Sequence, residues 1–214
     1  MILTTQFYLY FVSLLETLKV GKNLLYPPYH QQKPSHLQQK QRQIWGYVAI
    51  AFNSVDSDRL SKVGPDRLCA EWLLKNGGGV GLVGMPRSRI LKDYNSLPAE
   101  NVKFKVQIAD ASNSSVMKIG LDHFIGCQYI DTVVLHNCKH LEDGGLEGLV
   151  HLKDTLKILQ VSGCYNLRNS CLDVIAKLTA LEHLRLFDLM YVKDLQAVAT
   201  KLRMSLPNCK VELS

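Results

Sequence analysis

The sequence contains 214 residues, of which 47% are hydrophobic and 21% are charged. This composition excludes a wholly disordered or collagen-like chain, and the absence of long apolar runs argues against a conventional transmembrane helix. The net charge of +6 is concentrated in residues 1–43, where five basic residues face Glu16 alone. The remainder is nearly balanced, so the composition gives no indication of nucleic-acid binding.

Residues 1–43 differ from the rest of the chain in composition. An apolar stretch over residues 7–15 is followed by a glutamine-rich tract with few acidic residues. A basic, acid-poor N-terminus is typical of a mitochondrial transit peptide, although arginine is scarce here. A secretory signal is the alternative, but no positive charge precedes the apolar stretch. We therefore expect a targeting leader over 1–43 and a mature protein that begins near residue 40.

Residues 44–98 are predicted to form an N-terminal helical domain. Ile44, Val48 and Phe52 recur at a spacing that places them on one face of a helix. A second helix is predicted to begin at Pro65, because proline suits the first helical position, where its missing N–H costs nothing. Three consecutive glycines downstream suit the end of that helix.

The glycine-rich segment after this helix matches a dinucleotide-binding fingerprint in spacing only. Gly79, Gly81 and Gly84 have the required intervals. A phosphate-binding turn needs a strand before it and a helix after it. Here a helix is predicted before the glycines, and Pro86 follows them. The segment is therefore interpreted as a flexible glycine loop.

A repeating pattern begins near residue 103, with a period of 25 to 27 residues. Each unit contains two apolar residues separated by one position, and this period is typical of a leucine-rich repeat with one short strand and one helix per unit. Leucines and isoleucines over 146–152 and 172–178 have helical spacing. The first apolar residues of the five strands are Val106, Val133, Leu159, Leu184 and Cys209.

The predicted fold is therefore α/β. A leucine-rich repeat domain of about four to five strand–helix units occupies residues 99–214, capped by the helical domain over 44–98.

The six cysteines are interpreted as reduced structural thiols, because their spacings are wide and the chain is not a small disulfide-dense domain. Cys138 and Cys164 follow predicted strands at a turn position where leucine-rich repeats point a side chain inward. Cys209 lies on a strand. The same interpretation is weaker for Cys127 and Cys171.

Two further groups of residues have the composition of a possible site. His136, Cys138 and His140 resemble metal ligands, but Cys138 is assigned to the core and no paired Cys-x-x-Cys is present, so exposed turn histidines are favoured. Glu142 and Asp143 precede a predicted helix, where acidic side chains cap free N–H groups. No recognisable Ser, His and Asp arrangement indicates a catalytic centre.

The strands of a short repeat array form a surface that binds extended protein segments. Residues between the buried positions of each strand point to that surface, because side chains alternate along a strand. Simple solvation of these residues is the alternative. The predicted partner-binding residues are Val134, Gln160 and Arg185, with Thr132, Ile158 and His183 on the same rows.

Several blocks of the sequence resemble the ATP synthase subunit s (coupling factor B) family. The resemblance covers residues 45 to about 210, and a related member is the distal membrane-arm assembly factor of respiratory complex I. The matching blocks include Val63-Gly64-Pro65-Asp66-Arg67, Ala70-Glu71-Trp72-Leu73-Leu74, Lys92-Asp93-Tyr94-Asn95 and Ile119-Gly120-x-Asp122-His123.

The resemblance implies a non-catalytic protein, peripheral to the matrix side of the mitochondrial inner membrane. Its partner would be the membrane sector of ATP synthase, where the family is ascribed a role in proton transport: it couples proton flow to ATP synthesis by blocking a proton leak. Complex I assembly is the first alternative, and a ubiquitin-ligase substrate adaptor is the second. Whether the chain forms a homo-oligomer stays open.

Two residue-level expectations follow from the resemblance. A weakly held Mg²⁺ ion is expected at Gly77 and Ser112, where serine replaces the family's threonine and keeps both oxygens. The family's Cys-x-Cys dithiol reads His136-Asn137-Cys138 here. The dithiol chemistry therefore does not carry over.

Overall fold

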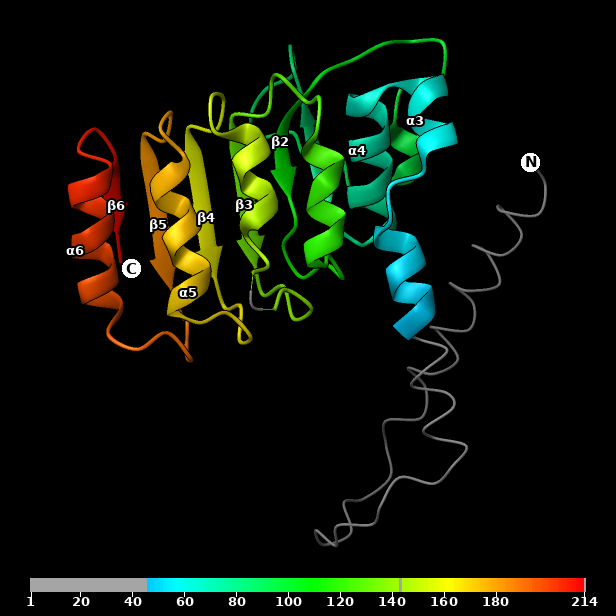
Figure 1. Cartoon of the computed structure of the whole chain (residues 1–214). Helices are drawn as coiled ribbons and strands as arrows, with labels where there is room; N and C mark the ends of the chain where they lie inside the picture. The colour runs from blue at the N-terminus through cyan, green and yellow to red at the C-terminus, as the bar shows by residue number, and fades with distance from the viewer. Residues whose placement is uncertain (1–45, 143, 214) are drawn as a thin grey trace, which may run out of the picture. The chain divides into compact units, whose positions relative to one another are not determined.

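A six-stranded sheet forms the centre of the computed structural model, whose described residues are 46–142 and 144–213 (Figure 1). The strands follow one another in chain order across the sheet, and the described residues belong to one compact unit. The predicted leader over 1–43 lies outside the described residues. The strands are β1 (Gly79–Leu82), β2 (Val106–Asp110), β3 (Thr132–His136), β4 (Ile158–Ser162), β5 (His183–Phe187) and β6 (Lys210–Glu212).

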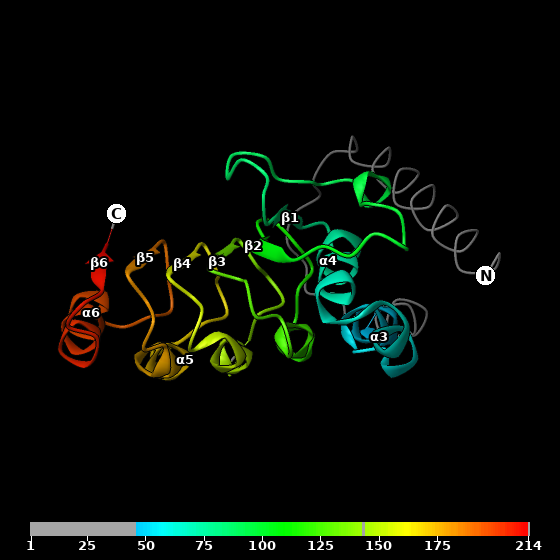
Figure 2. The same ribbon diagram turned by 90° about the horizontal axis from the view of Figure 1, so that it is seen from above.

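The helical segments after the strands cover one face of the sheet, and none of the described segments covers the opposite face of β3–β5 (Figure 2). A helix over 46–53, α3 (Ser57–Val63) and α4 (Pro65–Lys75) precede β1. Every helix in these ranges is too short or too polar to cross a lipid bilayer. The remaining segments are η1 (Tyr94–Ser96), η2 (Lys118–Phe124), η3 (Glu147–Leu152), α5 (Asn169–Leu172), η4 (Asp173–Lys177) and α6 (Leu195–Ser205).

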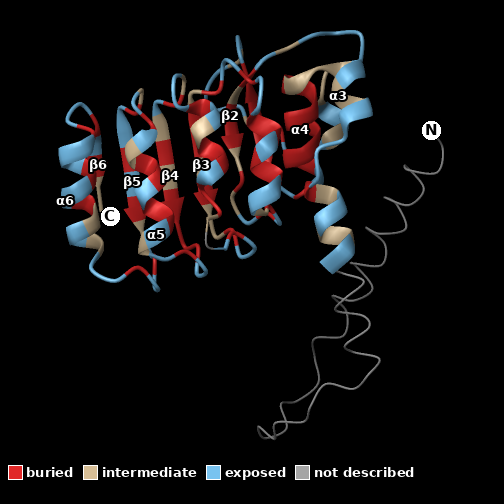
Figure 3. Cartoon of the chain, in the orientation of Figure 1, coloured by how far each residue is buried: buried red, intermediate tan, exposed pale blue. Residues whose placement is uncertain are grey.

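The five strands predicted from the repeat are present and pair in parallel, and β3, β4 and β5 pair in the predicted register. The predicted register is wrong for β2 and β6, because Ala109 and not Val106 pairs with Val133, and Val211 and not Cys209 pairs with Leu184. Val133 pairs with Leu159, Leu159 with Leu184, and Leu184 with Val211. These side chains are buried between the sheet and the helical segments (Figure 3). The apolar periodicity therefore predicted the core-facing positions of β3, β4 and β5 correctly, whereas Cys209, predicted to lie on a strand, directly precedes β6.

The flexible loop predicted at the glycine motif is wrong, because residues 79–82 form strand β1. This strand pairs antiparallel with β2 and is wholly buried. A Cβ atom added to Gly81 would lie 3.0 Å from Cβ of Ile108, so glycine permits a close approach to the neighbouring strand. The segment over 44–98 thus contributes a strand to the sheet as well as helices.

The helical segments of the repeat are mostly 3₁₀ helices. Residues 147–152 form η3, and α5 runs directly into η4 over 169–177. A 3₁₀ helix rises about 2.0 Å per residue, against about 1.5 Å for an α-helix. A 3₁₀ segment therefore needs fewer residues than an α-helix to span the length of a five-residue strand and bring the chain back to the start of the next strand.

The turns after the strands contain residues with positive φ at equivalent places. Asn113, Asn137, Gly163 and Asp188 have φ values of 59°, 55°, 61° and 53°. The first three donate their N–H groups to the last residue of the next strand, at 2.8, 2.8 and 3.3 Å. Asparagine, aspartate and glycine tolerate this left-handed conformation best. The turn then points the following side chain into the core.

Two cysteines occupy this inward turn position, as predicted. Cys138 donates its thiol to the carbonyl of Ala111 at 3.1 Å, and Cys164 donates to the carbonyl of Leu135 at 3.4 Å. The adjacent Cys164 thiol and burial together raise the pKa of Cys138 well above its usual value. All six cysteines are buried free thiols.

Replacing Cys138 or Cys164 by alanine is expected to lower the free energy of unfolding by about 1–3 kcal/mol each, through lost packing and a lost backbone contact. Urea denaturation measures the change. Cys209→Ala is the matched control and should cost less, because Cys209 is 8% exposed whereas Cys138 and Cys164 are fully buried, and its thiol donates a longer hydrogen bond of 3.8 Å to the carbonyl of Lys210. Equal losses in all three variants, or fewer than six free thiols in the denatured, unreduced chain, would contradict this assignment.

Candidate functional site

The predicted partner-binding residues lie side by side on the uncovered face of the sheet. Val134 pairs with Gln160, and Gln160 pairs with Arg185, on three neighbouring strands. Arg185 donates from Nη1 to Oε1 of Gln160 at 3.4 Å. Val134 and Gln160 are half-buried and Arg185 is exposed. We call these three residues, with Phe187, the open strand face.

Sequence reasoning missed several residues that share this face. Ser162 lies two positions after Gln160, and its Oγ is 2.9 Å from Nδ1 of His136 and 3.0 Å from Nε2 of Gln160. Phe187 lies under Arg185, with its ring centre 5.6 Å from the guanidinium carbon. The alternation that identified Gln160 and Arg185 also identifies their neighbours two positions on, so this signal was present in the sequence.

One expected member of the face is buried. Thr132 is 8% exposed, because Arg87 donates to its hydroxyl at 2.6 Å. Arg87 also forms two 2.8 Å bonds to the carboxylate of Asp131. Burial opposes ionisation of Asp131, but the bonds from Arg87, Thr132 and Gln107 outweigh it and lower the pKa of Asp131.

Arg87 belongs to the long segment that connects β1 to β2. This segment lies over β1 and β2, on the face of the sheet opposite the helical segments (Figure 2). The Arg87–Asp131 ion pair fixes its first part beside β3. The segment therefore bounds the open strand face on one side.

The most specific family-like block is a structural junction between helix and sheet. Asp66, at the start of α4, accepts from the backbone N–H of Val106 at 3.0 Å and from Nζ of Lys105 at 2.9 Å. Arg67 donates to the carbonyls of Pro98 and Ala99 at 2.6 and 2.7 Å. These contacts attach α4 to β2 and to the β1–β2 segment.

Glu71 joins α4 to α3. Its side chain is buried and accepts from Nε and Nη2 of Arg59 at 3.0 and 2.6 Å. Arg67 lies 4.0 Å from the same carboxylate. The hydrogen bond and charge of Glu71 raise the pKa of Arg59, although burial acts in the opposite direction.

The second family-like block packs against Trp72. The ring of His123 stacks on Trp72 with the centroids 4.8 Å apart, and burial lowers the pKa of His123. A Cβ atom on Gly120 would lie 2.5 Å from Oδ1 of Asn53 and 2.6 Å from the Trp72 ring. Only glycine fits at this point without a shift of its neighbours.

The two residues expected to hold magnesium lie in neighbouring turns. Gly77 follows α4 and Ser112 follows β2. The turns touch, because Ser115 donates its N–H to the carbonyl of Asn76 at 2.9 Å. The Asp110 carboxylate accepts from the Ser112 N–H at 3.0 Å. Carbonyl, hydroxyl and carboxylate oxygens of this kind fit a hard cation.

His136, Cys138 and His140 do not form a metal centre in the structure. Within residues 46–142 and 144–213, no group of three or more His, Cys, Asp or Glu side chains is placed to hold a metal ion. Cys138 is fully buried, whereas His140 is exposed. The expected exposed turn histidine is present at His140, but the expectation is wrong for His136, which ends β3, is half-buried and contacts Ser162.

Comparison with known proteins identifies relatives over most of the chain. Mitochondrial ATP synthase subunit s of Bos taurus is 37% identical over 176 residues, which cover 80% of this chain and 87% of that protein. The Mus musculus protein of the same name is 34% identical over 177 residues, covering 81% and 88%. The Homo sapiens protein is 34% identical over 176 residues, covering 80% and 87%. No family model matches the chain.

Proposed function

Because the chain belongs to the ATP synthase subunit s family, we propose that it is a non-catalytic mitochondrial protein that associates with ATP synthase. The observation that carries this proposal is the 37% identity to the bovine subunit over 87% of that protein's length. The fold supports a binding role, because a sheet with one open face offers a platform for an extended protein surface. We assign the repeating units to the leucine-rich type, with the helices before β1 as their cap.

The proposed location is the matrix side of the inner membrane, reached by means of the leader and held through protein contacts. There the chain binds the membrane sector of the synthase and blocks a proton leak, so that proton flow remains coupled to ATP synthesis. Depletion from mitochondria is expected to raise respiration in the absence of ADP, and re-expression should restore it. Unchanged respiration after depletion would contradict this role, and a selective loss of assembled complex I would favour the alternative.

The open strand face is the proposed contact with the synthase. Replacing Gln160 and Arg185 together by glutamate reverses the local charge without touching the core, so the melting temperature should stay nearly unchanged while association weakens. The matched control is Lys153→Gln with Lys177→Glu, which makes the same change of charge at exposed positions outside this face. Co-purification with the synthase measures the effect. Full association of the folded Gln160→Glu, Arg185→Glu variant would move the contact away from this face.

We also propose that Gly77 and Ser112 hold Mg²⁺ weakly, through their backbone and hydroxyl oxygens. The ion would link the turns after α4 and β2 and would take part in no reaction. Addition of Mg²⁺ should raise the melting temperature of the wild type, and Ser112→Ala should remove this rise. Ser170→Ala, at an exposed site, is the control. A wild type that does not respond to Mg²⁺ would contradict the site.

A further inference from the structure

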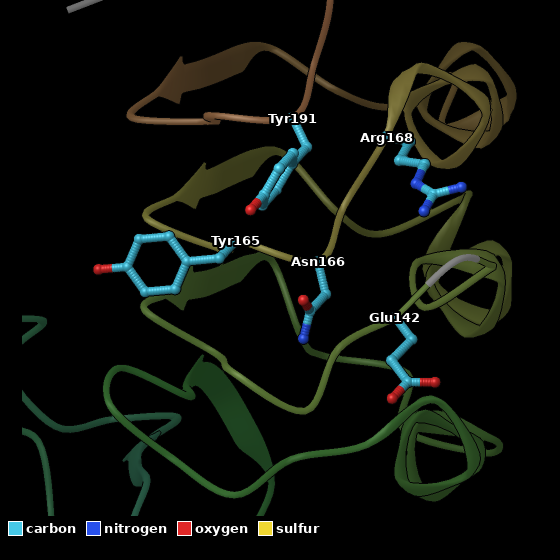
Figure 4. A pocket seen from close by; sticks show the side chains of 5 residues that line it. All are labelled: Glu142, Tyr165, Asn166, Arg168 and Tyr191. Atoms are coloured by element: carbon cyan, nitrogen blue, oxygen red, sulfur yellow. The ribbon is translucent and has the colours of Figure 1, made fainter. Parts of the chain in front are cut away.

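A second surface feature lies at the carboxyl ends of β3, β4 and β5. The three turns that follow these strands enclose a pocket of about 490 Å³ (Figure 4). The residues of the pocket follow the ends of β3, β4 and β5 in the sequence, and Phe187 of the open strand face is the last residue of β5. The pocket is lined by Glu142, Tyr165, Asn166, Arg168 and Tyr191.

On the side of the pocket nearer the strands lie the side-chain oxygen of Asn166 and the aromatic rings of Tyr165 and Tyr191. The side-chain amide of Asn166 donates to the carbonyl of Lys139 at 2.7 Å, which directs its nitrogen away and leaves Oδ1 toward the tyrosines (Figure 4). Tyr165 and Tyr191 are 41% and 61% exposed. A pocket with these surfaces favours a positively charged group.

Glu142 supplies the negative charge of the pocket. The sequence predicted that this residue caps the following helix, but η3 has no side-chain cap bond. Glu142 is exposed, and its carboxylate is paired with no other residue that the structure describes. Glu142 and Arg168 both lie on the helix side of the pocket, and Arg168 has an interaction of its own, so a cation would enter from the side of the tyrosines and reach Glu142 past Asn166 (Figure 4).

We propose that this pocket binds a lysine or arginine side chain presented by a partner protein. The cation would contact the Glu142 carboxylate and the Asn166 oxygen and would pack against the rings of Tyr165 and Tyr191. Tyrosine and arginine are frequent among the residues that dominate binding energies at protein interfaces, and buried pockets near them receive anchor side chains. Met190, 74% exposed, adds apolar surface at the rim. This inference rests on the proposed function, because the pocket would be a further part of the surface that contacts the synthase.

A titration with short peptides tests the pocket without any partner complex. The probes are acetyl-Gly-Arg-Gly-amide and its glutamate and glutamine counterparts, and the readout is the NMR signals of labelled tyrosine rings and asparagine side-chain amides in the full chain. The arginine peptide should shift the signals of Tyr165, Tyr191 and Asn166 to saturation. In Glu142→Gln its affinity should fall about tenfold, which corresponds to about 1.4 kcal/mol.

Glu182→Gln is the matched control, because it removes an exposed carboxylate outside the pocket and should leave the affinity unchanged. Equal or stronger binding of the glutamate peptide, an unaltered affinity in Glu142→Gln, or shifts confined to other residues would overturn the proposal. Since this titration contains no synthase, its failure is distinguishable from a failure of the proposed function, which is judged by association in mitochondria.

Discussion

Replacing Glu71 by alanine is expected to lower the free energy of unfolding by about 3 kcal/mol. The Glu71 carboxylate is 1% exposed and accepts two hydrogen bonds from Arg59. Its removal leaves Arg59 and the buried Arg67 without their shared buried counter-charge. We expect a value at the lower end of the range for broken buried ion pairs, because Arg59 keeps partial access to water.

Glu100→Ala is the matched control for this change. Glu100 contacts the same Arg59 but is exposed, so solvent screens the pair and its loss should have almost no effect. Urea denaturation of both variants gives the comparison, and near-ultraviolet circular dichroism reports whether the environment of Trp72 is kept. Equal losses in the two variants would show that burial of Glu71 does not decide its contribution.

Replacing Asn53 by alanine is expected to lower the free energy of unfolding by about 3–5 kcal/mol, because several buried groups lose a hydrogen-bond partner at once. Asn53 is fully buried. Its Oδ1 accepts from Nε1 of Trp72 at 3.2 Å and from the N–H of Met117 at 2.9 Å. Its Nδ2 donates to Asn76, to Ala49 and to the carbonyl of Ser115.

A local measurement accompanies the change in stability at Asn53. Hydrogen exchange of the Met117 N–H should accelerate more than that of the Val161 N–H, which lies in the middle of β4. Asn95→Ala is the control, because this asparagine is exposed and bonds only within its own turn, so its free energy change should stay within about 0.5 kcal/mol. A loss in Asn53→Ala no larger than this would contradict a stabilising role of the Asn53 hydrogen bonds.

The strands of the repeat could be predicted because the positions that hold apolar residues in the sequence are the positions that are buried in the fold. Val133, Leu159 and Leu184 each face the core, and their spacing along the chain equals the length of one unit. The same alternation placed Gln160 and Arg185 on the opposite face. These predictions need only local pattern and period.

Strand β1 and the burial of Thr132 could not be predicted in this way. A glycine-rich strand has few side chains to show alternation, and β1 exists through its pairing with β2, a partner much later in the chain. Thr132 is covered by Arg87 from a segment far upstream. Both features depend on tertiary contacts that a local pattern does not record.

The family-like block shows a third limit of sequence reasoning. Asp66 has the position of an acidic residue that stabilises a helix start through the helix dipole. In the structure it also accepts the N–H of Val106 and so attaches α4 to the sheet. The sequence identified this residue as distinctive, but only the fold reveals the group that it binds.

Native gel electrophoresis of gently solubilised mitochondria, with antibody detection of the endogenous protein, tests the proposed association most directly. The proposal predicts co-migration with assembled ATP synthase, and loss of this co-migration in Gln160→Glu, Arg185→Glu but not in Lys153→Gln, Lys177→Glu. Co-migration with respiratory complex I in place of the synthase would contradict the account and assign the chain to complex I assembly.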